Sequence, residues 1–224
     1  MPSTLGIVDS TWTPLTFAPS LWLDAAETST ITESGGSVSQ WDDKSGNGLH
    51  VSQANAAFQP TTGAVSQNGL NVLEFSTDNL RSAKITQPLP ITMFIVAATQ
   101  DLSSSNRQAI ANRGITPTIF QVNQRWSFYN GSVVSGSTPI DNNYHVLSAL
   151  FDGANSELRL DGALEASANP GSNFYDDQII LIGSDFNVNF DWDGYIAEII
   201  MYFYAMSITQ QQRVENYLLD KWGL

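Results

Sequence analysis

The sequence predicts an all-β domain, a sandwich or barrel that ends in one short C-terminal α-helix. Short apolar runs recur at close spacing without helical segments between them, which is typical of such folds. Charged residues make up only 14% of the 224 residues, and 42% are hydrophobic. A low charged share with abundant Ser, Thr, Asn and Gly favours a β-sandwich over a helical protein, and the hydrophobic share is sufficient for a sizeable core.

Two runs carry the strongest strand signal. Residues 91–99 are the most β-prone stretch of the chain and predict a central strand. In residues 195–204 the odd positions, from Tyr195 to Phe203, are all apolar, so they are expected to face the core. The even positions are amphipathic and include Glu198, which also favours a strand inside a sheet. Further strands are expected at residues 21–25, 37–41, 69–76, 108–112, 144–151, 157–160 and 178–183, with a two-residue turn at Asp161-Gly162.

The helix is predicted from its ends as well as its face. Ser207 is a suitable N-cap with Gln210 three residues later, which is a capping-box pattern, and Gly223 suits the C-cap. Apolar residues recur at helical spacing at Val214, Tyr217, Leu218 and Trp222. We expect this helix to lie over one end of the sandwich and to bury Trp222.

The chain divides into residues 1–20, expected to form an extended N-terminal arm, and residues 21–224, expected to form one domain. Pro2, Pro14 and Pro19 interrupt the arm, in which a short strand is expected at residues 5–8. The first residues lack the basic and apolar regions of a secretory signal. No apolar run reaches the ~20 residues of a membrane helix, so no membrane insertion is expected.

Charge and cysteine content exclude several classes of function. A net charge of −13 argues against a nucleic-acid partner, because phosphate binding needs clustered Lys and Arg. The chain has no cysteine, which excludes disulfides, a thiol nucleophile and a cysteine metal site.

Residues 41–48, Trp-Asp-Asp-Lys-Ser-Gly-Asn-Gly, form a turn-rich loop. Its glycines can take positive φ, and Asp42, Asp43 and Asn47 can close Asx-type turns. The oxygen spacing fits no EF-hand, so a structural turn is favoured over a ligand or cation loop.

Residues 119–130 alternate between apolar even positions and polar odd positions. The even set, including Phe120, Trp126 and Phe128, is expected to face the core, and the odd set solvent or a groove. An aromatic ring beside a guanidinium group suits sugar binding, so Arg125 and Tyr129 are the predicted ligand-binding residues; the alternative is an ordinary solvated face.

Several segments together resemble the concanavalin A-like lectin/glucanase superfamily, and more narrowly the laminin G-like domains of tailed-phage structural proteins and bacterial surface proteins. They are residues 21–26 (Leu-Trp-Leu-Asp-Ala-Ala), 38–48, 68–75 (Asn-Gly-Leu-Asn-Val-Leu-Glu-Phe), 144–153, 160–162, 193–200 (Asp-Gly-Tyr-Ile-Ala-Glu-Ile-Ile) and 217–224 (Tyr-Leu-Leu-Asp-Lys-Trp-Gly-Leu). The resemblance implies a jelly-roll sandwich of two antiparallel sheets, and binding of glycans or proteins more often than catalysis. The motif residues look structural.

Catalysis is not expected. Glucanases of this superfamily place paired carboxylates on one strand, and the sequence has no such Glu-x-Asp-x-Glu pattern. A catalytic triad would need His50 or His145, neither of which accompanies a nucleophile motif. Relatives often bind calcium with loop oxygens, so calcium is a candidate cation. Its candidate ligands are Asp42, Asp43, Asp152, Asp185, Asp191 and Asp193.

The sequence therefore predicts a non-catalytic binding or structural module of a phage particle that recognises host-surface glycan. One alternative is a capsid decoration or other virion structural protein that acts through protein–protein contacts, with residues 1–20 carrying assembly. A weaker alternative is a polysaccharide-degrading enzyme. The expected partners are a glycan or a virion protein, with a homo-oligomer as an analogy to phage appendages, and the expected location is the virion or another extracellular surface.

Overall fold

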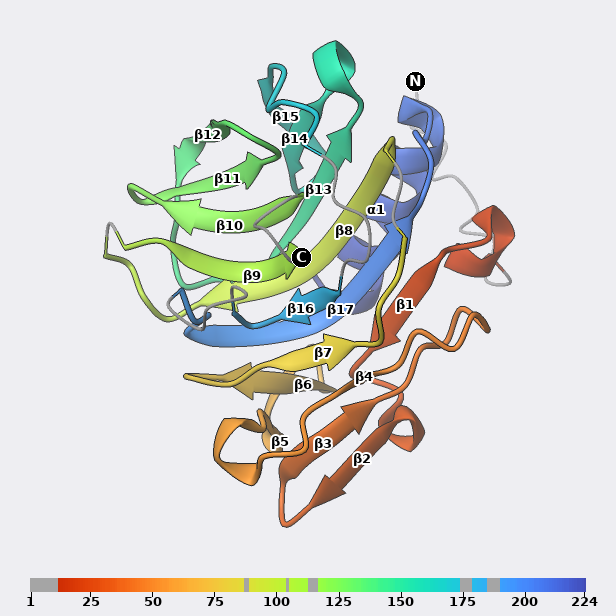
Figure 1. The fold of residues 1–224 in the computed structure, drawn as a ribbon, viewed down its shortest axis with the longest axis vertical. Coiled ribbons are helices and arrows are strands. Elements are labelled where there is room, and N and C mark those ends of the chain that lie inside the picture. Colours follow the sequence, from red (N-terminus) through yellow and green to blue (C-terminus); the bar gives the residue numbers. More distant parts are fainter. Residues whose placement is uncertain (1–11, 87–88, 104, 113–116, 174–178, 185–189) are drawn as a thin grey trace, which may run out of the picture.

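The computed structural model describes residues 12–86, 89–103, 105–112, 117–173, 179–184 and 190–224 (Figure 1). The strands are β1 (Leu21–Asp24), β2 (Ile31–Ser34), β3 (Ser37–Trp41), β4 (Val51–Ser52), β5 (Thr61–Gln67), β6 (Leu70–Phe75), β7 (Leu80–Ser82), β8 (Ile91–Thr99), β9 (Arg107–Asn112), β10 (Thr118–Val122), β11 (Arg125–Tyr129), β12 (Val133–Pro139), β13 (His145–Phe151), β14 (Glu157–Leu160), β15 (Ala163–Ser167), β16 (Ile180–Ile182) and β17 (Gly194–Tyr202). The helices are η1 (Pro14–Phe17), η2 (Thr28–Thr30), η3 (Ala56–Phe58), η4 (Gly153–Asn155) and α1 (Ile208–Trp222). The predicted all-β fold with a C-terminal helix is confirmed.

One stretch of the sheet is built around β17 and β8, which pair along eight positions. On its other side β17 pairs with β6 near its start and with β1 further along. Beyond β8 the order continues through β13 and β14 to β15, and beyond β6 it continues to β5. The predicted central position of residues 91–99 and of β17 is therefore confirmed.

The remaining strands continue in the order β2, β3, β4, β7, β16, β9, β10, β11 and β12. A pairing of Ser37 with Thr61 joins this stretch to the first one. All pairings between the described strands are antiparallel, and they form one continuous sheet rather than the two separate sheets expected from the sequence.

The sheet nearly closes where β12 and β15 meet at what we call the seam. There the carboxylate of Glu165 on β15 accepts hydrogen bonds from the backbone N–H groups of Ser137 (2.7 Å) and Thr138 (2.8 Å). It also accepts from both of their hydroxyl groups. A side chain thus satisfies the backbone of the β12 edge, which would otherwise be open to pairing with another chain.

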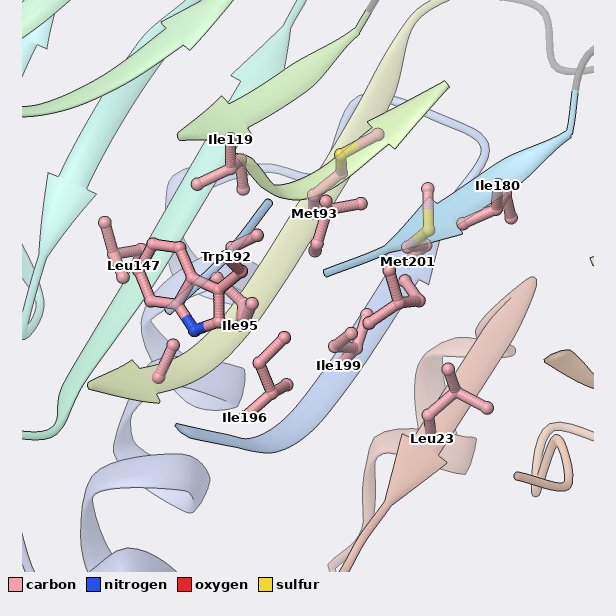
Figure 2. Close-up of a cluster of buried hydrophobic side chains, with 14 of the residues drawn as sticks. Leu23, Met93, Ile95, Ile119, Leu147, Ile180, Trp192, Ile196, Ile199 and Met201 are labelled. Carbon is pink, nitrogen blue, oxygen red and sulfur yellow. The ribbon is translucent and has the colours of Figure 1, made fainter. Parts of the chain in front are cut away.

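The main core fills the space enclosed by the curled sheet. Figure 2 shows Met93, Ile95, Leu147 and Ile199 pointing from one stretch toward Ile119 and Ile180 on the other, with Trp192 between them. Trp41, Trp126 and Trp192 are fully buried in this core. Burial of aromatic rings of this size contributes a large part of the hydrophobic stabilisation.

A second core lies between the outer face of the sheet and α1. The helix buries Val214, Leu218 and Trp222 against side chains from β1, β6, β8, β13 and β17 (Figure 1). Its predicted ends are confirmed, because Ser207 and Gln210 form a capping box and Gly223 is the left-handed C-cap. The expectation that the helix covers one end of the sandwich is wrong: its apolar face is wide enough to cover the sheet face instead.

A β-bulge changes the alternation predicted for β17. Ile196 is opposite Ala97, but Glu198 is opposite Val96, so Ala197 is an extra residue. Ile199 and Met201 face the main core as predicted, whereas Ile196 faces that core and Tyr195 and Ala197 face outward, the reverse of the prediction. The bulge leaves Glu198 pointing outward beneath α1.

Residues 12–20, the described part of the predicted arm, lie against the body of the domain. Trp12 packs edge-on against Phe17 and Tyr217, and the hydroxyl of Tyr202 donates to the carbonyl of Pro14. The strand expected at residues 5–8 lies outside the described residues. Within the described ranges, no helix has the length and apolarity needed to cross a bilayer.

Candidate functional site

Three of the segments behind the family resemblance, residues 21–26, 193–200 and 217–224, meet at the buried carboxylate of Glu198. Its oxygens accept hydrogen bonds from Nε1 of Trp22 (2.7 Å), Nε1 of Trp222 (2.8 Å) and Nζ of Lys221 (2.6 Å). Lys221 also pairs with Asp24 at 2.7 Å, and Lys44 pairs with Asp24 at 2.6 Å. Glu198 is fully buried, so this network stabilises the packing of α1 on β1 and β17 and is closed to a ligand.

The two acids of this network are shifted in opposite directions. Burial, reinforced by the charge of Asp24, raises the pKa of Glu198 despite its contact with Lys221. Burial would also raise the pKa of Asp24, but Lys221 and Lys44 outweigh it and hold that pKa below its ordinary value. Both pKa shifts arise because the two acids share one buried site with Lys221.

The loop at residues 41–48 is a structural turn, as favoured from the sequence. Asp43 is nearly buried, and its carboxylate accepts hydrogen bonds from the backbone N–H groups of Trp22, Ser45 and Leu49 and from the Ser45 hydroxyl. With four donors already bound, this carboxylate serves the fold.

A groove of about 680 Å³ opens beside this loop and is the candidate functional site. It is lined by residues of the 48–55 segment, η3 and β7: Gly48, His50, Ser52, Gln53, Ala54, Asn55, Phe58, Arg81, Ser82 and Ala83. Phe58 is 42% exposed, which is unusual for a large aromatic side chain and gives the groove an apolar wall. The other lining groups are mostly amides, hydroxyls and basic side chains.

Asn79, which is buried, organises the groove from below. Its carboxamide oxygen accepts from Nε2 of Gln53 (2.8 Å) and from Nε of Arg81 (3.0 Å). Its backbone N–H donates to the carbonyl of Phe58 (3.0 Å). One buried residue therefore fixes an amide, a guanidinium group and the aromatic turn relative to one another.

The short helix that presents Phe58 is fixed by its own sequence. The side chain of Asn55 caps η3 by accepting from the backbone N–H of Ala57 (3.1 Å). Gln59 ties the same segment to the carbonyl of Gln53 through Nε2 (2.7 Å). These two contacts fix the segment that carries Phe58 beside the groove.

The predicted ligand residues Arg125 and Tyr129 are not in this groove. Both are half-exposed on β11, on the same side of that strand as Ser127. Arg125 contacts only the neighbouring carbonyl of Gln124 through its side chain (3.4 Å), among described partners. Nothing in these contacts distinguishes a ligand site from a solvated face, so their role stays a prediction.

The alternation that suggested these residues comes from a hairpin rather than one strand. Asn123 and Gln124 both have positive φ and form a two-residue turn between β10 and β11. Trp126 and Phe128 face the core as predicted, but they are opposite Gln121 and Ile119, which therefore share the inner face. The expectation that Phe120 faces the core with them is wrong, because the turn reverses the parity.

The described residues contain no group of three or more His, Asp or Glu side chains placed to hold a metal ion. Of the six candidate calcium ligands, Asp185 lies outside the described ranges. Asp42 accepts from Nε2 of Gln40 (2.7 Å), and Asp152 accepts from Asn155 (3.0 Å). Calcium binding stays an untested prediction.

His145 has a more specific setting than its sequence context predicted. Its Nδ1 lies 2.7 Å from Asp161 and its Nε2 lies 2.9 Å from Asp141. Burial lowers the pKa of His145, but the two carboxylates outweigh it and raise the pKa above its ordinary value. Both ring nitrogens are occupied, so His145 ties the end of β13 to two turns.

The groove residues were missed because nothing in residues 48–59 or 79–83 forms a motif. The available signal was Phe58, a single aromatic residue in the polar stretch Gln53-Ala-Asn-Ala-Ala-Phe-Gln. Turn-forming residues on both sides of Phe58 are a signal that its ring lies on the surface.

Comparison with known proteins shows the fold. No protein-family model and no curated protein sequence matches the chain. Domain 4 of a GH43 extracellular arabinanase from Geobacillus stearothermophilus, solved in complex with arabinotriose, is similar with a TM-score of 0.64 and 11% identity. That match covers 88% of this chain and 98% of the arabinanase domain.

Two larger proteins contain a similar unit. Trypanosoma rangeli sialidase in complex with sialic acid has a TM-score of 0.61 and 12% identity over 92% of this chain and 33% of its own. The binding domain of botulinum neurotoxin serotype D/C has a TM-score of 0.61 and 11% identity over 91% of this chain and 53% of its own. The chain thus spans a third of the sialidase and about half of the toxin domain.

Proposed function

We propose that this protein is a non-catalytic glycan-recognition module and that its saccharide binds in the groove beside Phe58. The observation that carries this proposal is the arrangement around Asn79, which holds an exposed aromatic ring next to the amide of Gln53 and the guanidinium donor of Arg81. Sugars are recognised by stacking of their apolar ring face on an aromatic side chain and by directional hydrogen bonds to their hydroxyls.

The lining of the groove favours binding over hydrolysis. Glycosidases need two carboxylates on either side of the scissile bond, about 5 to 9 Å apart. Among the described residues that line the groove there is no Asp or Glu. We therefore propose that the chain binds its saccharide without cleaving it.

The arabinanase domain supports this proposal by analogy, because it matches almost end to end and was solved with a bound oligosaccharide. We further propose that the chain belongs to the concanavalin A-like jelly-roll family. We also propose that it lies on a phage particle, where host-surface glycan is its ligand. These two proposals are supported by the motif resemblance alone.

A glycan array with the full chain tests the proposed function. We expect Phe58→Ala to abolish binding to the glycans that the wild type retains, while Tyr129→Ala leaves it intact. The reverse pattern would move the site to β11, and an array without signal would overturn glycan recognition. Release of reducing ends from a bound polysaccharide would overturn the non-catalytic part.

A further inference from the structure

Arg81 has no acidic partner among the described residues, unlike four other basic side chains of this protein. Lys44, Arg107, Arg159 and Lys221 each pair with Asp or Glu. In the described ranges Arg81 makes no ion pair, and its one side-chain hydrogen bond joins Nε to Asn79. On a chain with a net charge of −13, a groove cation without a carboxylate is a chemical feature of the site.

The orientation of the guanidinium is fixed from its inner edge. Nε of Arg81 donates to the carboxamide oxygen of Asn79, which Gln53 holds in place. The terminal nitrogens are left to donate elsewhere. A planar guanidinium group matches a carboxylate through two parallel N–H···O bonds, and a fixed one loses little side-chain entropy on binding.

His50 adds a second donor to the same groove. The backbone N–H of Asp43 points at its Nδ1 (3.1 Å), and Nε2 has no partner among the described residues. Oδ1 of Asp42 also lies 3.1 Å from Nδ1 of His50. Asp42 is thus a carboxylate that contacts a lining residue without lining the groove itself. A ligand anion near Arg81 would meet donors from Arg81 and His50 and no carboxylate of the lining itself, while both side-chain N–H groups of Gln53 remain on Asn79.

We infer that the groove selects a saccharide that carries a carboxylate, such as a hexuronate, with Arg81 binding the carboxylate and Phe58 packing on the sugar ring. This inference rests on the proposed function and names its ligand class. The net negative charge of the chain does not prevent it, because charges further than about 8 Å away are screened at physiological ionic strength.

Isothermal titration calorimetry on matched ligand pairs tests the inference. The probes are oligomers of galacturonate, mannuronate and glucuronate, each compared with the same oligomer after chemical reduction of its carboxyl groups. The variants are Arg81→Gln, Arg81→Lys and Phe58→Ala. Arg213→Gln is the matched control, because it removes one positive charge from the exposed face of α1, where Arg213 packs on Trp12.

We expect the wild type to bind at least one acidic oligomer ten times or more tighter than its reduced form. Arg81→Gln should remove this preference by weakening binding of the acidic form much more than binding of the reduced form, and Arg81→Lys should keep part of it. Phe58→Ala should weaken both, and Arg213→Gln neither. Equal affinity for both forms, or a preference that survives in Arg81→Gln, would overturn the inference while the proposed function stands. An array without any glycan signal would overturn both.

Discussion

Trp222 donates its indole N–H to the fully buried carboxylate of Glu198 at 2.8 Å, so the last turn of α1 is joined to the central strand of the sheet. The carboxylate also holds Trp22 and Lys221. Hydrogen bonds to a buried charge are strong, and a charge left without its partner is costly.

Glu198→Ala should lower the free energy of unfolding by about 3–5 kcal/mol, because it leaves two buried indole N–H groups without an acceptor and Lys221 with Asp24 alone. Trp222→Phe keeps an aromatic ring but loses the hydrogen bond, worth roughly 1.5–3 kcal/mol, and also leaves a cavity because phenyl is smaller than indole. Urea unfolding curves measure both. Asp220→Asn on the exposed side of α1 is the control and should stay within about 0.5 kcal/mol. Equal losses in all three variants would contradict the role of Glu198.

His145 predicts a dependence of stability on pH. Because Asp161 and Asp141 raise its pKa in the folded state, protonated His145 stabilises the fold. This contribution is fully present below the unfolded pKa of about 6.5 and is lost as pH rises through the higher folded pKa. Unfolding free energies measured from pH 5 to 9 should fall over that window, and His145→Gln should remove the fall. A profile unchanged by His145→Gln would contradict the assignment.

Gly194, at the start of β17, should not tolerate a side chain. It has φ +150°, and a Cβ atom there would lie 2.2 Å from the carbonyl oxygen of Ala98. Gly194→Ala should therefore destabilise the protein by several kcal/mol, more than the backbone strain of about 1–3 kcal/mol alone. Gly63→Ala separates the two effects, because Gly63 has φ +83° and open space around it. Equal melting temperatures for the two variants would contradict the steric argument.

Opening the seam should be visible in hydrogen exchange. Glu165→Ala removes the acceptor for the N–H groups of Ser137 and Thr138, so these two amides should exchange faster than in the wild type. Amides of β8, at the centre of the sheet, should keep their protection. Mass spectrometry with peptide-level resolution measures both regions, and unchanged exchange at β12 would show that the seam is held by something else.

The features predicted well from the sequence are those in which local chemistry and tertiary packing agree. The capping box at Ser207, the C-cap at Gly223 and the apolar run at residues 91–99 each contain their own signal. The turn at Asp161-Gly162 is likewise confirmed by positive φ at both residues.

The errors came from features that a period-two pattern cannot show. Ala197 is an extra residue in β17, and Asn123 and Gln124 form a turn between two strands. Each feature reverses the face on which odd-numbered and even-numbered residues lie. Gln at the second position of such a turn is unusual, since this position normally favours glycine. The alternation over residues 119–130 therefore predicts one strand where the structure has two.

The candidate groove could not have been predicted, because its parts are local in space and not in sequence. Phe58 and Arg81 are brought together by Asn79, whose own side chain is buried. No periodicity or motif records that contact. Exposed residues of a binding site obey no packing pattern, whereas the buried residues of the Glu198 network lie in segments that carried the family resemblance.

The Glu198 network also bears on the order in which the chain can fold during synthesis. Trp22 precedes Glu198 by 176 positions, and Trp222 follows it by 24. Because α1 follows both strands in the chain, the network cannot close until α1 has left the ribosome and folded onto the sheet. Until then, water solvates Glu198 and the outer face of the sheet. Docking of α1 is thus the step that removes water from this face of the sheet.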